Sequence, residues 1–154
     1  MGQGTMTVFN DVALQLGEKI HDFASGGEDY KAMIINATKV AAATDANAKK
    51  ADYTEVSGGT YAEIALANQD FTLTGAIASF VADAINWAKD AASGPTDCYQ
   101  VLIYLDDGPD YNAVAFMDLT LDGGTTPLSL KDAAIGVNFG AGTDEILQVE
   151  ANVA

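Results

Sequence analysis

Two apolar runs on either side of a polar turn are the most clearly patterned stretch of the chain. The first run, residues 99–105, is apolar almost throughout, which is typical of a strand covered on both faces, although a buried helical turn has the same pattern. In the second run, residues 113–121, one side is apolar and the other becomes polar only toward its end. Residues 106–110 (DDGPD) between them favour a turn. The pattern predicts a β-hairpin inside a larger sheet, because an isolated hairpin is only marginally stable in water.

Further short segments of apolar or alternating residues predict strands on both sides of this hairpin. These segments are residues 31–40, 61–67, 71–74 and 146–149, and residues 128–132 and 133–139 predict one or two more strands. Residues 78–92 have apolar residues at both helical and strand spacing, and the turn signals that bracket them favour a strand through Trp87. Residues 41–52 indicate a loop or a short helical turn, and glycine-rich turns are expected at residues 122–127 and 140–142.

The spacing of these segments predicts the fold class. We expect a mainly β protein, an antiparallel, jelly-roll-like β-sandwich of seven to eight short strands with a short N-terminal helix or arm. Strands do not alternate with long helices, so a parallel α/β sheet is disfavoured.

The first 25 residues have a different pattern from the rest. Residues 1–10 are glycine-rich and predict an extended arm, and from an N-cap at Asn10 or Asp11 the apolar residues follow helical spacing to residue 23. We expect a short amphipathic helix there, interrupted by Gly17. This divides the chain into an arm and helix at residues 1–25 and a β-sandwich domain at residues 26–154.

The charge of the chain narrows the set of partners. Its 154 residues are enough for one domain with a sizeable core, and they include 22 acidic residues against seven lysines and no arginine, a net charge of −15. Nucleic acids and anionic membranes are therefore disfavoured. The acidity favours a highly soluble surface and is compatible with a basic partner or a divalent cation. No segment approaches the roughly 18 apolar residues of a membrane-spanning helix, and the N-terminus lacks the pattern of a secretory signal.

Candidate chemistry is sparse, and we expect no enzyme, no cofactor and no metal. His21 is the only histidine and Cys98 the only cysteine, so a catalytic triad is disfavoured, and Cys98 is expected to be a small buried hydrophobe. Aspartates 106, 107 and 110, with 118 or 122, place hard oxygens near one turn, as calcium prefers, but their spacing is not that of an EF-hand and favours solvated turn residues. A convergent carboxylate pair in a deep cleft would instead support an enzyme or a carbohydrate-binding domain unrelated to virions.

An ordered series of short motifs resembles a family of small tailed-bacteriophage virion proteins, which includes head decoration, cement and fibre-like proteins. The most distinctive motif is TEVSGGTYA at residues 54–62. The others, in order, are residues 31–35, 71–72, Trp87, 103–106, 118–119, 128–132, 135–139 and 146–148. The series departs from the family where Glu63 replaces a frequent arginine and where Leu105 precedes the aspartate, and residues 1–25 have no counterpart.

The resemblance implies a β-sandwich structural component of the virion without catalytic residues. The negative charge favours the outer surface of the head over the inner surface, which faces packaged nucleic acid. We therefore expect a capsid decoration or cement protein that binds the major capsid protein, forms a homotrimer, and resides in the host cytoplasm during assembly. The alternative is a tail or head-fibre component with a host-recognition role, of which carbohydrate binding is one form.

In this interpretation the N-terminal segment makes the contact with a neighbouring copy or with the shell. The candidate interface residues are Phe9, Val12, Leu16, Ile20 and Phe23. The alternative is that the helix packs on its own sandwich.

Overall fold

The computed structural model describes residues 5–120, 125–139 and 146–150, and the predicted turn at residues 140–142 lies outside them. Within these residues the chain forms ten strands, one short α-helix and one 3-10 helix, and every strand pair is antiparallel. The mainly β, sandwich-like fold class is confirmed.

The central sheet contains five strands in the order β1-β8-β7-β2-β3. Their bounds are Met6–Val8 (β1), Ala113–Asp118 (β8), Gln100–Leu105 (β7), Tyr30–Ile35 (β2) and Ile64–Ala65 (β3). Strands β7 and β8 form the predicted hairpin, and β7 also pairs with β2 along its whole length. Valine, isoleucine, leucine and tyrosine dominate β2 and β7, as expected for central strands.

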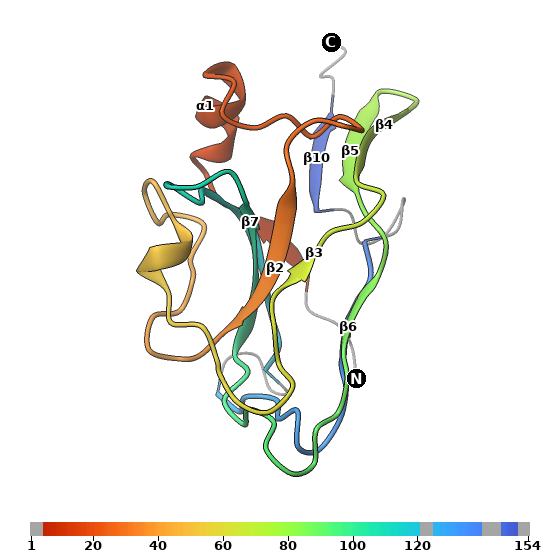
Figure 1. Cartoon of the computed structure of the whole chain (residues 1–154). Helices are drawn as coiled ribbons and strands as arrows, with labels where there is room; N and C mark the ends of the chain where they lie inside the picture. Colours follow the sequence, from red (N-terminus) through yellow and green to blue (C-terminus); the bar gives the residue numbers. More distant parts are fainter. Residues whose placement is uncertain (1–4, 121–124, 140–145, 151–154) are drawn as a thin grey trace.

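A second layer lies beside the central sheet (Figure 1) and consists of two smaller sheets. One has the order β10-β5-β4, and the other pairs β6 with β9. Their bounds are Leu147–Glu150 (β10), Ile77–Val81 (β5), Asp70–Thr74 (β4), Ile85–Trp87 (β6) and Ile135–Val137 (β9). Aromatic rings join the layers: the ring of Tyr30 on β2 lies 5.1 Å from that of Phe80 on β5.

Residues 36–53 cover the opposite face of the central sheet and include the 3-10 helix η1, Lys50–Asp52 (Figure 1). The side-chain amide of Gln100 on β7 both accepts from and donates to the backbone of Ala41, which ties this covering segment to the sheet. All six residues of β7 are buried as a result. The expectation that residues 99–105 form a strand covered on both faces is therefore confirmed.

The N-terminal segment is more integrated into the fold than we expected. Residues 6–8 pair with β8 as an edge strand and do not form a free arm. The helix α1 spans only Val12–Gly17, and Lys19 beyond it has a left-handed φ of 59°, so the predicted helix to residue 23 ends early. Asp11 makes no side-chain cap, because its carboxylate accepts the backbone N–H of Asn47 instead.

Several predicted strands have different bounds in the structure. The strand at residues 31–40 ends at Ile35, because the side chain of Asn36 accepts the N–H of Thr38 and turns the chain. Residues 61–67 provide only the two-residue strand β3, since residues 54–56 and a tyrosine side chain described below occupy the rest of the backbone edge of β2.

The two ambiguous regions are also resolved. The strand favoured through Trp87 is present in two parts, because residues 78–81 belong to β5 and residues 85–87 form the separate strand β6. Residues 128–132 form no strand, although Leu128 makes an isolated bridge with Cys98.

Candidate functional site

The motif at residues 54–62 closes the open edge of β2. The hydroxyl of Tyr61 accepts the backbone N–H of Ile34 at 2.8 Å and donates to the carboxylate of Glu55 at 2.9 Å. Burial, opposed by the Ile34 hydrogen bond, raises the pKa of Tyr61. The phenol therefore stays protonated and satisfies a backbone group that no strand reaches.

The two glycines of the motif bring it against the loop after β6. Gly59 has a φ of 57°, and a Cβ there would lie 2.0 Å from a carboxylate oxygen of Asp90, so a side chain does not fit. That carboxylate accepts the backbone N–H groups of Thr60, Ala92 and Ser93. These hydrogen bonds, from Ser93 first and then from Thr60, lower the pKa of Asp90.

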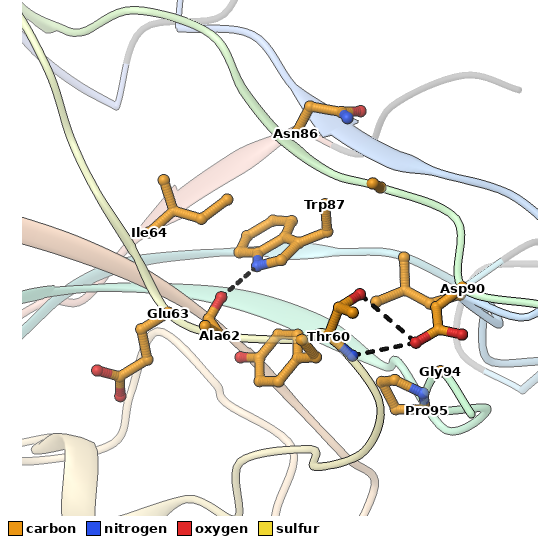
Figure 2. Close-up of a pocket in the computed structure, with 12 residues that line it drawn as sticks. Thr60, Ala62, Glu63, Ile64, Asn86, Trp87, Asp90, Gly94 and Pro95 are labelled. Atoms are coloured by element: carbon orange, nitrogen blue, oxygen red, sulfur yellow. Dashed lines mark hydrogen bonds between the residues drawn. The ribbon is translucent and has the colours of Figure 1, made fainter. Parts of the chain in front are cut away.

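A hollow of about 330 Å³ lies between this motif and β6 (Figure 2). Tyr61 and Trp87 form its aromatic wall, with ring centroids 6.3 Å apart and an interplanar angle of 25°. The Trp87 indole donates to the carbonyl of Ala62 at 2.8 Å, as Figure 2 shows. Only 4% of Trp87 is exposed, so its ring holds β6 onto the motif and offers little surface for a ligand.

The carboxylate of Glu63 points away from Trp87 (Figure 2) and toward a second polar cluster on the outer face of the sheet. There it forms an ion pair with Lys50, whose ammonium also lies 5.0 Å from the ring centroid of Tyr104. Burial would raise the pKa of Glu63, but hydrogen bonds from Lys50 and Tyr104 outweigh it and lower that pKa. Glu63 is therefore an ionised carboxylate with its own counter-ion.

Glu55 lies beside this ion pair, and its pKa is shifted in the opposite direction from that of Glu63. Burial and the negative charge of Glu63 raise the pKa of Glu55, against the hydrogen bond from Tyr61, which lowers it. Two neighbouring carboxylates with opposite pKa shifts can divide the roles of acid and base. Only Glu55 lines the open hollow of about 350 Å³ whose walls include Met33, Lys50 and Tyr111. Glu63 borders the hollow beside β6 instead, so the two carboxylates do not line one common pocket.

The candidate interface residues of the N-terminal segment lie mostly in the chain's own core. Phe9, Val12 and Phe23 are at most 3% exposed, while Leu16 and Ile20 are partly buried against the same core. The ring of Phe23 lies 4.4 Å from that of Phe80 and 5.2 Å from that of Tyr30. The alternative interpretation, a helix packed on its own sandwich, therefore describes this structure, and these three side chains anchor the segment internally.

The aspartates of the central turn are separated by their partners. Asp106 forms an ion pair with Lys31 at 2.7 Å, Asp110 forms one with Lys49 at 2.6 Å, and the Asp118 carboxylate accepts the N–H of Thr120. Asp122 lies outside the described residues. Within the part of the chain that the structure describes, no three His, Cys, Asp or Glu side chains are grouped to hold a metal ion.

The single histidine and the single cysteine are both buried. His21 bonds the side-chain oxygen of Gln15 at 2.8 Å and stacks on Phe23, and desolvation lowers its pKa to about 4. Burial raises the pKa of the Cys98 thiol to about 11, so a thiolate nucleophile is disfavoured there.

The structure also presents an apolar edge that the sequence reasoning did not single out. Strand β4 is an outer strand of its sheet, and its Phe71 and Leu73 are 37% and 72% exposed. The alternation of Phe and Leu with Thr in this strand predicts an apolar face. Local sequence does not say whether another element covers that face.

Comparison with family models, with curated proteins and with solved structures found no match for the chain. No helix among the described residues is long and apolar enough to cross a membrane.

Proposed function

We propose that the chain is a non-enzymatic structural protein of a virion, a decoration or cement protein on the outer surface of a phage head. Its partners are then the major capsid protein and other copies of itself in a homotrimer, and it resides in the host cytoplasm before assembly. One observation carries this proposal: a strongly acidic domain, whose internal polar clusters are largely paired, leaves an apolar strand edge uncovered at β4. Uncovered apolar patches are typical of protein contact sites.

The roles of the motif at residues 54–62 are consistent with this proposal. Tyr61 satisfies the edge of β2, Gly59 permits the approach to Asp90, and Trp87 fastens the second layer. The residues that carry the resemblance to virion proteins therefore have structural tasks inside the sandwich. This supports a role that depends on a stable shape more than on a reactive group.

The charge supports the outer location. Packaged nucleic acid would repel a chain of net charge −15 from the inner surface, whereas the outer surface imposes no such cost. A subunit that bridges neighbours only in the assembled shell stabilises the shell through mass action.

Quantitative mass spectrometry of purified particles tests the proposal. We expect a copy number comparable to that of the major capsid protein and a loss of particle heat resistance when the chain is removed. A copy number that is a small fraction of that value would favour a tail or fibre. Absence from particles would overturn the virion assignment.

The second candidate function is a fibre component that recognises carbohydrate on the host. The hollow beside β6 favours it, because the partly exposed ring of Tyr61 and the exposed side chain of Asn86 line the same site, and sugars stack on aromatic rings. Binding to a glycan array, abolished by the Tyr61→Ala substitution with the fold retained, would support this candidate over the first.

A further inference from the structure

Strand β4 is the longest outer strand among the described sheets. It has five residues, whereas the other outer strands β1, β3, β6, β9 and β10 have two to four. Short outer strands, prolines and lysines are the usual devices that prevent unwanted pairing at a sheet edge. The sequence of β4, DFTLT, contains neither proline nor lysine.

The backbone groups at the free edge belong to Phe71 and Leu73. Thr74 pairs with Ile77 across a two-residue turn, so Thr74, Thr72 and Asp70 direct their N–H and C=O groups toward β5. The carbonyl of Phe80, opposite Phe71, accepts from Ile146 on the β10 side, which agrees with this alternation. The backbone N–H and C=O groups of Phe71 and Leu73 therefore point away from β5, toward the free edge.

Leu73 provides the best-exposed part of this edge. The outward N–H of Phe71 is already accepted by the Asp70 carboxylate at 2.8 Å, but no described group bonds the outward N–H or C=O of Leu73. The side chain of Leu73 is also 72% exposed. Unpaired backbone groups and an uncovered apolar side chain thus coincide at one residue.

The surroundings of the edge are acidic. The segment at residues 18–29 lies next to β4, since Phe23 packs 6.1 Å from Phe71 and the N–H of Ser25 bonds Asp70. It carries four exposed acidic residues and one lysine. No basic residue occurs between Lys50 and Lys89, so β4 and β5 add none.

We propose that the free edge of β4 binds an extended segment of a partner protein in which alternating apolar residues are flanked by lysine or arginine. The segment adds an antiparallel strand beside β4, as in other cases of strand addition. Its apolar residues pack on Phe71 and Leu73, and its cations face the acidic residues of the 18–29 segment. A second copy of this chain fits less well, because pairing two β4 edges would bring two such acidic rims together.

The identity of the partner protein rests on the proposed function, under which the bound segment belongs to the major capsid protein. The chemistry of the edge does not depend on that assignment. The test therefore has one arm with a peptide and one with particles.

In the first arm, the probe is a synthetic peptide of alternating valine and threonine with two lysines at each end, and its counterpart carries glutamates in place of the lysines. We expect the full chain to bind the lysine peptide, by fluorescence anisotropy, at least about tenfold more tightly than the glutamate peptide. Binding of the lysine peptide should weaken as salt is raised. Equal affinity for both peptides, or binding of neither, would overturn the inference.

Two variants locate the binding site. Leu73→Pro removes the outward N–H without removing a bond to β5, and Leu73→Glu keeps that N–H but places a charge on an exposed position. Both variants should retain the far-ultraviolet circular dichroism spectrum of the parent. Their affinity for the lysine peptide should be lower by about tenfold or more. Retained binding in a folded Leu73→Glu variant would contradict the site even if Leu73→Pro failed to fold.

In the second arm, particles depleted of this chain are incubated with the parent and with Leu73→Glu. Binding of the parent alone supports both the edge and the virion assignment. Equal binding of the two overturns the edge and leaves the assignment standing, whereas binding of neither overturns the assignment. Self-association that sedimentation detects in the parent and not in Leu73→Glu would identify a second copy as the occupant and overturn the proposed partner.

Discussion

Strands β7 and β4 both contain large apolar residues but are covered very differently. The six residues of β7 are buried between β2 and β8, with residues 36–53 on one face and the second layer on the other. In β4, by contrast, three of five residues are exposed. The difference arises from position in the sheet: an inner strand buries both faces and both edges, whereas an outer strand keeps one edge free.

The comparison indicates which strands stabilise the fold and which strand is accessible to a partner protein. The strands β2, β7 and β8 are almost entirely buried in the apolar core, and the β4 edge contributes little to it. Substitutions in the two strands should therefore separate folding from binding.

The largest expected effect is in β7. Ile103 is fully buried, so Ile103→Ala should lower the free energy of unfolding by about 2–5 kcal/mol, because it removes apolar contacts and leaves a cavity. The matched control is Leu73→Ala in β4, which is 72% exposed and should cost less than about 0.5 kcal/mol. Urea denaturation measures both, and similar losses would contradict the contrast between the strands.

Acid should weaken the aromatic cluster that joins the layers. Its His21 has a pKa lowered from 6.5 to about 4 by desolvation, so the unfolded chain binds more protons in that range. The stabilisation is complete above pH 6.5 and is lost as the pH falls toward 4, by at most about 3 kcal/mol. Denaturation at several pH values measures this loss.

The control for this prediction is His21→Phe, which keeps a ring against Phe23 but cannot titrate. Its stability should be lower at neutral pH, since Gln15 loses its partner, and should vary less between pH 6.5 and 4. An unchanged pH dependence would assign the acid sensitivity to the carboxylates.

A smaller effect is expected at the sheet edge that the protein does close. Tyr61→Phe leaves the N–H of Ile34 without its acceptor, which should cost about 1–3 kcal/mol. Tyr53→Phe is the control, because its hydroxyl bonds only the side chain of Asp45. If urea denaturation shows that the two substitutions lower the free energy of unfolding equally, the hydrogen bond by which Tyr61 closes the β2 edge does not stabilise the fold.

The smallest effect is expected at Glu55, whose pKa is raised. A group with a raised pKa stabilises the fold below its unfolded pKa, and that contribution is lost as the pH rises through its folded pKa. Glu55→Gln should therefore stabilise the protein at neutral pH by about 0.5 kcal/mol or less, and the gain should vanish near pH 4. A loss of stability at neutral pH would show that the charged carboxylate is favourable there.

Much of the β architecture could be predicted because its signals are local. The hairpin of β7 and β8 and the strand at β4 follow from apolar runs bounded by turn residues, and their predicted positions hold to within a few residues. The bounds of α1 could not be predicted. Asp11 at its start bonds Asn47, which is distant in the sequence, and Lys19 beyond its end has a left-handed φ.

The candidate site was less predictable. The motif at residues 54–62 was found as a motif, but its task depends on partners at Ile34, Asp90 and Trp87. The N-terminal apolar residues have the same spacing whether a helix packs on its own sandwich or on a neighbour. Only the position of Phe23 against Phe80 distinguishes the two.

The sequence by itself determined the mainly β class, the central hairpin and the strongly acidic surface, because these depend on residue type and on spacing along the chain. Only the tertiary structure decided which strand edges are closed and which is free. Tyr61 closes the edge of β2 from 27 residues away, and nothing described closes Leu73. Covering an edge requires a distant segment to reach it, and the local pattern of a strand contains no information about that segment.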